Sequence, residues 1–228
     1  MSTFTSQIRR EADPIWQANF QHPFVKGIAN GELSLESFRY YVLQDSYYLS
    51  HFARIQALGA AKAADLYTTS RMAAHSQGTY EAELGLHEKF IKQLGVTKEE
   101  LDSFEPSPTA YAYTSHMYRV AADGSLGEII AAILPCYWIY YEIGQTLKGS
   151  TPGVPIYNEW IEAYGGEWFS ELVNEQISRL DVLAAGASEQ ERKKMKQHFM
   201  ISSQYEFLFW DMAYKLETWP VATESIQA

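Results

Sequence analysis

Cysteine, long apolar runs and signal-like segments are scarce or absent in this 228-residue sequence. Its single cysteine, Cys136, cannot form a disulfide within the chain, which excludes the class of disulfide-stapled domains. No uncharged apolar run approaches the roughly 18–20 residues that span a bilayer. Residues 1–16 alternate polar and charged side chains and lack the apolar core of a secretory signal peptide. We therefore expect a cytoplasmic protein that does not enter a membrane.

Basic residues are also few. The sequence has 18 Lys and Arg against 28 Asp and Glu, a formal net charge of −10. Nucleic acids and anionic membranes bind basic surfaces, so neither is expected as the main partner. Hydrophobic residues make up 46% and charged residues 20%, which is the balance of a globular chain able to bury a substantial core.

Strand-like alternation is missing as well, whereas helical signals are abundant. Long helices are expected over residues 3–20, 34–63, 66–94 and 188–218. Ser34 and Ser107-Pro108 are typical helix starts, and Gly95 is a typical helix end. Capping boxes indicate three more starts, at Thr97/Glu100, Ser125/Glu128 and Ser188/Glu191.

Glycine and proline mark the remaining boundaries. Residues 148–155 (KGSTPGVP) indicate a loop, and Gly165-Gly166 separates two helices. About eight helices with short connections predict an all-α fold, a single-domain helical bundle spanning residues 1–220. Residues 221–228 are expected to form a loose C-terminal tail.

Two helices carry a carboxylate inside an aromatic stripe. Positions 41, 45, 48 and 52 share one helix face, where Asp45 lies among Tyr41, Tyr48 and Phe52. A buried aspartate needs a donor or a raised pKa. A hydrogen bond to a core tyrosine or an arginine would account for Asp45 without any function; a binding site is the alternative.

Glu206 is placed in the same way on the last helix. It shares a face with Phe199, Phe209 and Trp210 and has no basic partner at i±3 or i±4. Asp211 differs because Lys215 follows it by one helical turn, which is typical of a surface ion pair. Glu206 is therefore the better candidate for a site.

The cysteine follows a proline inside a helical segment. Pro135 removes a backbone donor and disturbs the preceding turn, so Cys136 could face a cavity. A lone cysteine is more often a small buried hydrophobic residue, and that alternative stays open. Tyr140 lies on the same face, one turn later. A thiol, two carboxylates and aromatic rings together suit the binding of a flat heteroaromatic ring and thiolate attack on it.

At this point the chain resembles the TenA (thiaminase II) family. The resemblance rests on QDSYYL at 44–49, LPCYWIYYEIG at 134–144 and SSQYEFLFWDMAY at 202–214, with matches through most of residues 5–220. It implies the haem-oxygenase-like helical bundle, and the presence of Cys136 implies the cysteine-containing branch. The implied activity is hydrolysis at the 5-methylene of 4-amino-2-methylpyrimidines, either aminopyrimidine or thiamin, in thiamin salvage.

The resemblance also assigns roles to the candidate residues. Cys136 matches the catalytic thiol and Glu206 the catalytic glutamate. Asp45 matches the aspartate that holds the 4-amino group and the adjacent ring nitrogen. Tyr48 and Tyr140 match the residues on either side of the ring.

Two further tyrosines match weaker motifs. Tyr113 and Tyr164 fall where tyrosine hydroxyls support the thiol and the glutamate. The resemblance further implies a homotetramer and a reaction without a metal or organic cofactor. It leaves open which substrate is preferred, and how Glu206 and Asp45 divide proton transfer.

Two other functions are compatible with a helical bundle of this kind. A di-iron bundle would use Glu-x-x-His pairs, and none of the six histidines has Glu three residues before it. His22 precedes a proline in an expected loop and could serve as a haem ligand only with unusual geometry. The second rival is a non-catalytic pyrimidine-binding or regulatory protein with the same pocket.

Overall fold

The computed structural model describes residues 2–221, without the side chains of residues 82–84. Within this part of the chain the ordered elements are all helices. The first half contains α1 (Phe4–Glu11), α2 (Asp13–Phe20), α3 (Pro23–Asn30), α4 (Leu35–Ala61), α5 (Leu66–Gly78), the π-helix η1 (Thr79–Leu84), α6 (Gly85–Gln93) and α7 (Lys98–Asp102). The second half contains α8 (Pro108–Asp123), α9 (Leu126–Leu147), α10 (Pro155–Tyr164), α11 (Glu167–Gly186) and α12 (Glu189–Lys215). The all-α prediction is confirmed.

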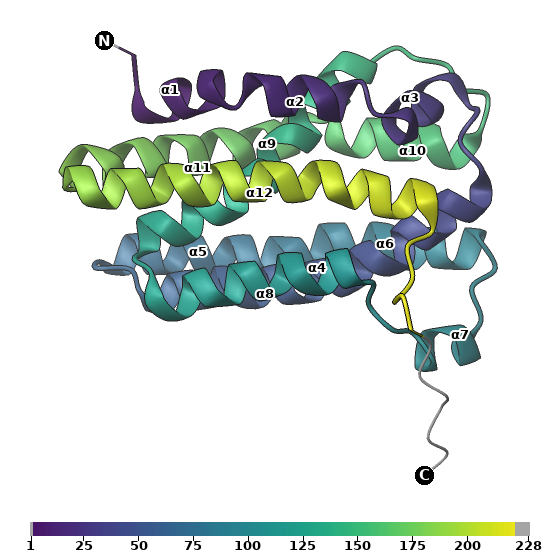
Figure 1. Cartoon of the computed structure of the whole chain (residues 1–228), viewed down its shortest axis with the longest axis horizontal. Coiled ribbons are helices and arrows are strands. Elements are labelled where there is room, and N and C mark those ends of the chain that lie inside the picture. Colours follow the sequence, from purple (N-terminus) through teal and green to yellow (C-terminus); the bar gives the residue numbers. More distant parts are fainter. Residues whose placement is uncertain (1, 222–228) are drawn as a thin grey trace.

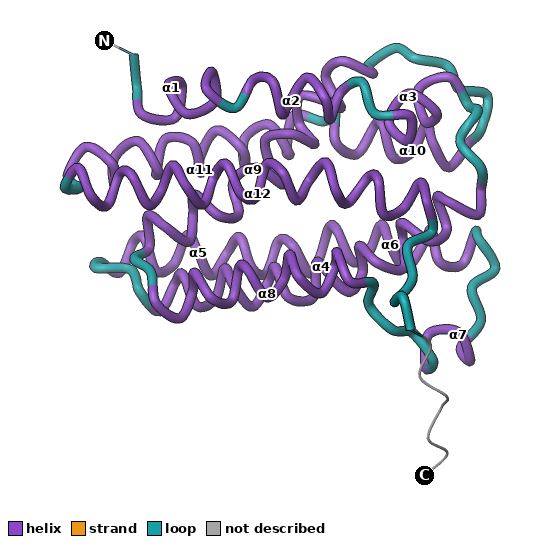
Figure 2. The backbone as a smooth tube through the Cα atoms, in the orientation of Figure 1, coloured by secondary structure: helices purple, strands orange, loops and turns teal. Residues whose placement is uncertain are grey.

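The helices form a layered bundle (Figure 1). In that view α4, α5, α6 and α8 make one layer, α9, α11 and α12 run through the middle, and α1 to α3 lie on the opposite side with α10. Helix α12 packs on α9, α2, α4 and α8, while α4 packs on α5, α8 and η1. The connections lie mainly at the ends of the bundle (Figure 2).

The predicted starts of the long helices are confirmed. The Ser34 hydroxyl caps α4 by accepting a hydrogen bond from the Ser37 amide. All three capping boxes form, and the boxes at Ser125 and Ser188 open α9 and α12. Gly95 has a φ of +64°, in the left-handed region that favours glycine after a helix end.

Two N-terminal expectations were wrong. The single helix expected over residues 3–20 is two helices that meet at Ala12, because Pro14 lacks the N–H that would continue α1. Helix α3 was not predicted, although Pro23 at its start and Gly31, with a φ of +76° just after its end, are typical boundary signals.

The helix expected over residues 66–94 is interrupted. Its middle turns form η1, a π-helix, between α5 and α6. A π-helical turn widens the helix and often lies at a functional site. Thr79, the first residue of η1, faces the pocket described below.

The core is built around α4, α9 and α12, whose buried side chains join one hydrophobic cluster. Helix α9 is the one described helix whose length and hydropathy would suit a membrane span, but 78% of its apolar window is buried inside the bundle. Its apolar character therefore belongs to a core helix. The helix continues through Pro135.

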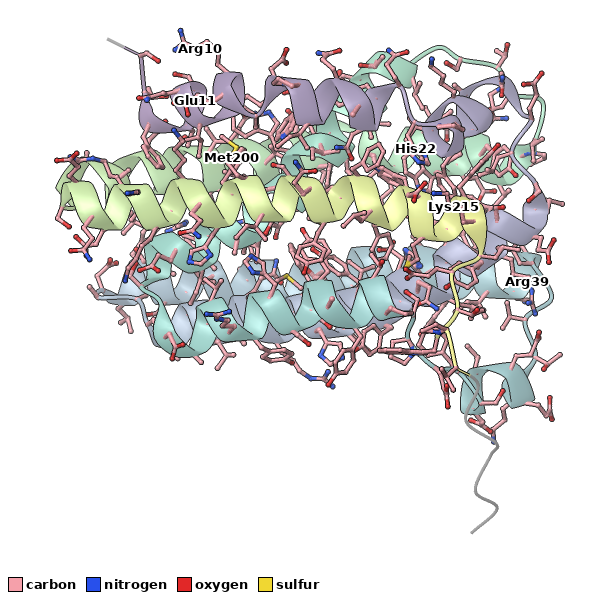
Figure 3. The ribbon with its side chains drawn as sticks, in the orientation of Figure 1. Arg10, Glu11, His22, Arg39, Met200 and Lys215 are labelled. Atoms are coloured by element: carbon pink, nitrogen blue, oxygen red, sulfur yellow. The ribbon has the colours of Figure 1, made fainter. Side chains whose placement is uncertain are left out.

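The charged side chains of Arg10, Glu11 and Lys215 are exposed on the outside of the bundle (Figure 3). Lys215 pairs with Asp211 over 2.7 Å, as the sequence predicted. Of the expected tail, residues 222–228 lie outside the described part of the chain.

Candidate active site

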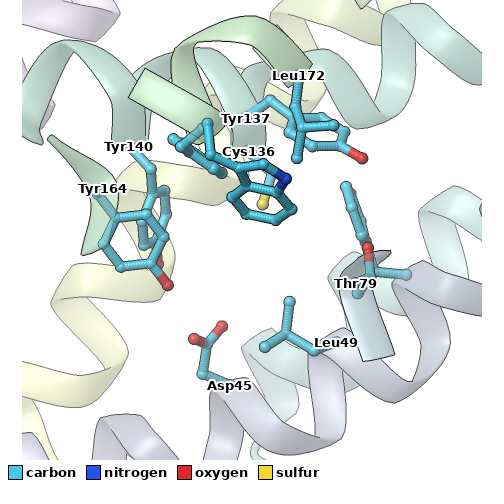
Figure 4. A pocket seen from close by; sticks show the side chains of 11 residues that line it. Asp45, Leu49, Thr79, Cys136, Tyr137, Tyr140, Tyr164 and Leu172 are labelled. Carbon is cyan, nitrogen blue, oxygen red and sulfur yellow. The ribbon is translucent and has the colours of Figure 1, made fainter. Parts of the chain in front are cut away.

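A pocket opens between α4, η1, α9, α10 and α11, with about 420 Å³ of space free of protein atoms, counting the part open to solvent. Its lining residues are Asp45, Leu49, Phe52, Thr79, Cys136, Tyr137, Tyr140, Tyr164, Trp168, Phe169 and Leu172. Asp45 and Leu49 lie on one side and Cys136 on the other (Figure 4). Four of the seven predicted site residues line this space.

Cys136 is half-buried and its sulfur points into the pocket (Figure 4). Its neighbours Pro135 and Tyr137 on α9 are buried. The position of the thiol is thus that of a pocket residue rather than of a sealed core side chain. A nucleophile needs this access to a bound ligand.

Asp45 faces the pocket from α4, and its side chain is almost fully buried. Its Oδ2 lies 3.0 Å from Nε2 of His87, a residue of α6 that is also buried. A tyrosine or arginine partner for Asp45 was one of the alternatives left open by the sequence; Tyr41 does interact with its carboxyl, and His87 was missed. The stripe of α4 itself is confirmed, because Tyr41, Tyr48 and Phe52 are all buried.

Glu206 lies on the buried face of α12 with only 2% of its surface exposed. The Tyr113 hydroxyl donates to its Oε1 over 2.5 Å. Burial raises the pKa of Glu206 to about 8; the Tyr113 hydrogen bond opposes this rise, and the charge of Asp45 adds to it. At neutral pH the carboxyl is protonated, the form needed to donate a proton.

Tyr48, Tyr113 and Glu206 do not line the pocket but lie next to it. The rings of Tyr48 and Tyr113 are 5.0 Å apart. Burial raises the pKa of both phenols well above the ordinary value, and the nearby negative groups, Cys136 among them, raise it further. Both phenols therefore stay neutral, and both lie near Cys136.

Tyr140 and Tyr164 form an aromatic wall beside Asp45 (Figure 4). Their ring centroids are 4.7 Å apart at an interplanar angle of 60°. The Tyr140 hydroxyl lies 3.3 Å from that of Tyr41. Gly144 of α9 allows the backbone of α10 to approach closely at Tyr164, since a Cβ on residue 144 would lie 2.4 Å from the Tyr164 carbonyl carbon.

The remaining wall was not predicted. Thr79 lines it from η1, and Trp168, Phe169 and Leu172 line it from the start of α11. Trp168 is 47% exposed and so lies at the solvent-facing rim. The sequence signal for this wall was the Gly165-Gly166 break followed by Trp168-Phe169. A helix start that is rich in aromatic residues and follows a glycine pair can border a pocket.

Tyr137, on the same wall, is held by a buried polar network. Its hydroxyl lies 3.1 Å from Nδ1 of His75 and also accepts from the Gln56 amide. Nε2 of His75 lies 3.2 Å from Glu175, whose pKa the Arg71 hydrogen bond lowers to about 2. The network fixes the ring of Tyr137 in the pocket wall.

The described residues contain no group of three or more His, Cys, Asp or Glu side chains placed to hold a metal ion. His22, considered above as a haem ligand, is buried and caps α3 by accepting from the Phe24 amide through Nδ1. Its Nε2 lies 3.6 Å from Asp211.

The chain is similar to proteins of known name over most of its length. The model of the TENA/THI-4/PQQC family matches residues 9–216. The chain is 56% identical to the aminopyrimidine aminohydrolase of Bacillus subtilis, over 95% of this chain and 92% of that protein. It is 44% identical to the protein of the same name from Halalkalibacterium halodurans, over 95% and 98% of the two chains.

Solved structures give the same result. A TenA homologue from P. horikoshii OT3 matches with a TM-score of 0.86 and 30% identity, over 93% of this chain and 99% of that one. A Shewanella denitrificans domain described as having a heme oxygenase-like fold matches with a TM-score of 0.72 at 16% identity, over 92% of each chain, which shows a shared fold alone. The predicted fold is thereby confirmed, and the chain belongs to the TENA/THI-4/PQQC family.

Proposed function

We propose that this protein is an aminopyrimidine aminohydrolase of the thiaminase II type, which replaces the leaving group on the 5-methylene of a 4-amino-2-methylpyrimidine with hydroxide. The observation that carries the proposal is that the Cys136 thiol and the Asp45 carboxylate face one pocket, in a chain 56% identical to a protein of that name. The two groups supply a nucleophile and a polar anchor for the ring.

The ring binds between the aromatic side chains, with Asp45 on its amino edge. Asp45 accepts from the 4-amino group and pairs with the adjacent ring nitrogen. Tyr140, which lines the pocket beside Asp45, contacts one face of the ring. Tyr48 lies next to the pocket and packs against Phe209 behind it. This orientation presents ring carbon 6 to the sulfur of Cys136.

The thiolate of Cys136 adds to ring carbon 6, forming an S–C bond and ending the aromaticity of the ring. The electron pair displaced onto ring nitrogen 1 takes a proton from Glu206. The resulting enamine expels the leaving group from the 5-methylene, thiazole as a neutral ring or the amino group as ammonia after it has taken up a proton. Water then adds to the methylene and loses a proton, nitrogen 1 returns its proton to Glu206, and elimination of the thiolate restores the aromatic ring.

Three groups next to the pocket support these steps. Glu206, with its pKa raised to about 8, is protonated at neutral pH and can supply the proton to nitrogen 1. Tyr113 donates to Glu206 and holds it in place. The neutral hydroxyl of Tyr48 stabilises negative charge on the nearby sulfur. Tyr164 closes the aromatic wall against Tyr140.

Both aminopyrimidine and thiamin carry the same ring, so both are proposed substrates in thiamin salvage. The reaction proceeds through the thiol and carboxylates of the chain without a metal or organic cofactor. We further propose a cytoplasmic location and a homotetramer, in keeping with the family resemblance.

The test is to give the purified protein aminopyrimidine and thiamin separately, and to measure ammonia release, thiazole release and hydroxymethylpyrimidine formation. We expect turnover of at least one substrate, with product formed in equal amount to the leaving group. The rival function, a non-catalytic pyrimidine binder, predicts saturable binding of both compounds without release. That outcome would refute the proposed activity.

A further inference from the structure

His87 lies directly behind Asp45. It belongs to α6, a helix that contributes no lining residue to the pocket, and only 1% of its surface is exposed. Its Nε2 contacts Oδ2 of Asp45 over 3.0 Å. Any effect of His87 on a bound ligand must therefore pass through Asp45.

The other ring nitrogen of His87 faces two acceptors. Nδ1 lies 3.3 Å from the Val42 carbonyl oxygen and 3.3 Å from the Ser46 hydroxyl oxygen. The Ser46 hydroxyl already donates its proton to Val42 O over 2.9 Å, so toward His87 it can only accept. The Val42 carbonyl oxygen can only accept as well, so these contacts favour a proton on Nδ1.

This arrangement bears on where the protons of the pair lie. With Nδ1 protonated, a neutral His87 would direct the lone pair of Nε2 at an oxygen of Asp45 3.0 Å away, so the contact calls for a second proton between them. An imidazole nitrogen is ordinarily a stronger base than a carboxylate oxygen, which favours this proton on His87. An imidazolium and a carboxylate in this arrangement share a charge-assisted hydrogen bond.

We propose that His87 is a positioning residue that keeps Asp45 ionised and oriented, so that the pocket selects the aminopyrimidine ring protonated at the nitrogen next to its 4-amino group. The inference rests on the proposed function. It adds the protonation state of the bound ring and assigns a residue that sets it.

Hydrogen-bond complementarity supports this choice. The edge of a neutral ring offers one donor, the amino group, and one acceptor, the ring nitrogen. An ionised carboxylate can only accept, so it matches the amino group and repels the nitrogen lone pair. After protonation the edge offers two parallel donors, as a guanidinium does, and binds a carboxylate through both oxygens.

Protonation also favours the chemistry. A cationic ring withdraws electrons from carbon 6 and is a better acceptor for the Cys136 thiolate. The described titratable groups that face Asp45 are His87, Tyr41, Tyr140 and Glu206. The two phenols and Glu206 are neutral at pH 7. Among these groups, His87 is therefore the one whose positive charge can offset the negative charge of Asp45.

The test is calorimetry of hydroxymethylpyrimidine binding in buffers of different ionisation enthalpy, which counts the protons taken up. Hydroxymethylpyrimidine lacks the aminomethyl group, so the protons taken up when it binds report on the ring. At a pH above the range in which the free ring is protonated, we expect the wild-type protein to take up about one proton per bound ligand.

His87→Gln is the informative variant. The amide can still donate to Asp45 but carries no charge, so the buried carboxyl of Asp45 takes a proton in the unbound protein and donates it to a neutral ring. We expect proton uptake to disappear and affinity to fall about tenfold, which corresponds to about 1.4 kcal/mol. His198→Gln is the matched control, since His198 contacts Glu128 away from the pocket; it should keep the wild-type uptake.

A purely structural role for His87 would leave the proton count unchanged. Equal uptake in the wild type and His87→Gln, or none in the wild type, would overturn the inference even if turnover of aminopyrimidine is normal. Failure of the wild type to bind hydroxymethylpyrimidine and to turn over aminopyrimidine would overturn the proposed function as well. Nitrogen chemical shifts of labelled histidine, compared between the wild type and His87→Gln, provide a second measurement, in which both ring nitrogens of His87 should be protonated.

Discussion

The Tyr113 hydroxyl donates a 2.5 Å hydrogen bond to Oε1 of Glu206, joining α8 to α12 next to the pocket. The bond holds the carboxyl of Glu206 at a depth where burial raises its pKa to about 8. The Tyr113–Glu206 pair is thus both a packing contact between two helices and a source of a proton. It should affect both the stability and the reaction rate, which gives two predictions.

The first concerns stability. The folded protein keeps Glu206 protonated between about pH 4.5, the ordinary value, and about pH 8, so in this interval it binds more protons than the unfolded chain. The Glu206 contribution to the free energy of unfolding must therefore fall as pH rises through this window. Glu206→Gln should remove this pH-dependent loss of stability. The loss is on the order of a few kcal/mol, because each pKa unit is worth about 1.4 kcal/mol.

Denaturant unfolding of both proteins from pH 4 to pH 9 checks this prediction. The stability curves should lie close together at the acidic end and separate toward the alkaline end, where Glu206→Gln should be the more stable protein. Parallel curves would show that Glu206 titrates normally.

The second concerns the rate. If protonated Glu206 is the acid, kcat/KM for aminopyrimidine should decline as pH rises through about 8. Glu206→Gln should lose most of the activity, roughly 10²–10⁴-fold for a lost general acid, together with this alkaline limb. A pH–rate profile of the two proteins tests it, and a variant that retains the same limb would assign the limb to another group.

Asp45 and Glu206 should differ in ligand binding. Asp45 lines the pocket and is proposed to anchor the ring, whereas Glu206 is proposed to act mainly during the reaction. We expect Asp45→Asn to weaken binding of hydroxymethylpyrimidine more than Glu206→Gln does, since Asn replaces one acceptor by a donor. Equilibrium titration measures both affinities, and the reverse order would exchange the two assignments.

The close packing of α9 against α10 gives a prediction outside the reacting groups. Gly144→Ala would place a methyl group 2.4 Å from the Tyr164 carbonyl carbon, so α10 and Tyr164 must shift. We expect a loss of about 1–3 kcal/mol in stability and a higher KM. Gly186→Ala is the control, because a Cβ there meets nothing within 4 Å. Equal effects of the two substitutions would contradict the proposed link between this contact and the site.

Much of the site could be predicted from residues whose sequence neighbours are informative. Asp45 and Glu206 stand out because each interrupts an aromatic stripe, and both stripes are buried as expected. Cys136 stands out because it follows a proline within a helix. For the two carboxylates, helical periodicity identified the face on which the residue lies.

The remainder depends on contacts between distant segments. His87 has no local feature that marks it, and its role is visible only when α6 packs against α4. The π-helix that begins at Thr79 gives no periodic signal of its own, so residues 66–94 resembled one regular helix. The break at Pro14 was predictable from its missing N–H, and the helical prediction for residues 3–20 overlooked it.

Substitution of the nucleophile tests the central claim most directly. Serine keeps the size of the side chain but is a much weaker nucleophile at neutral pH. We predict that Cys136→Ser abolishes ammonia and thiazole release, yet binds hydroxymethylpyrimidine with nearly the wild-type affinity, measured by calorimetry on the same preparation. Near-normal turnover by Cys136→Ser would contradict the covalent mechanism.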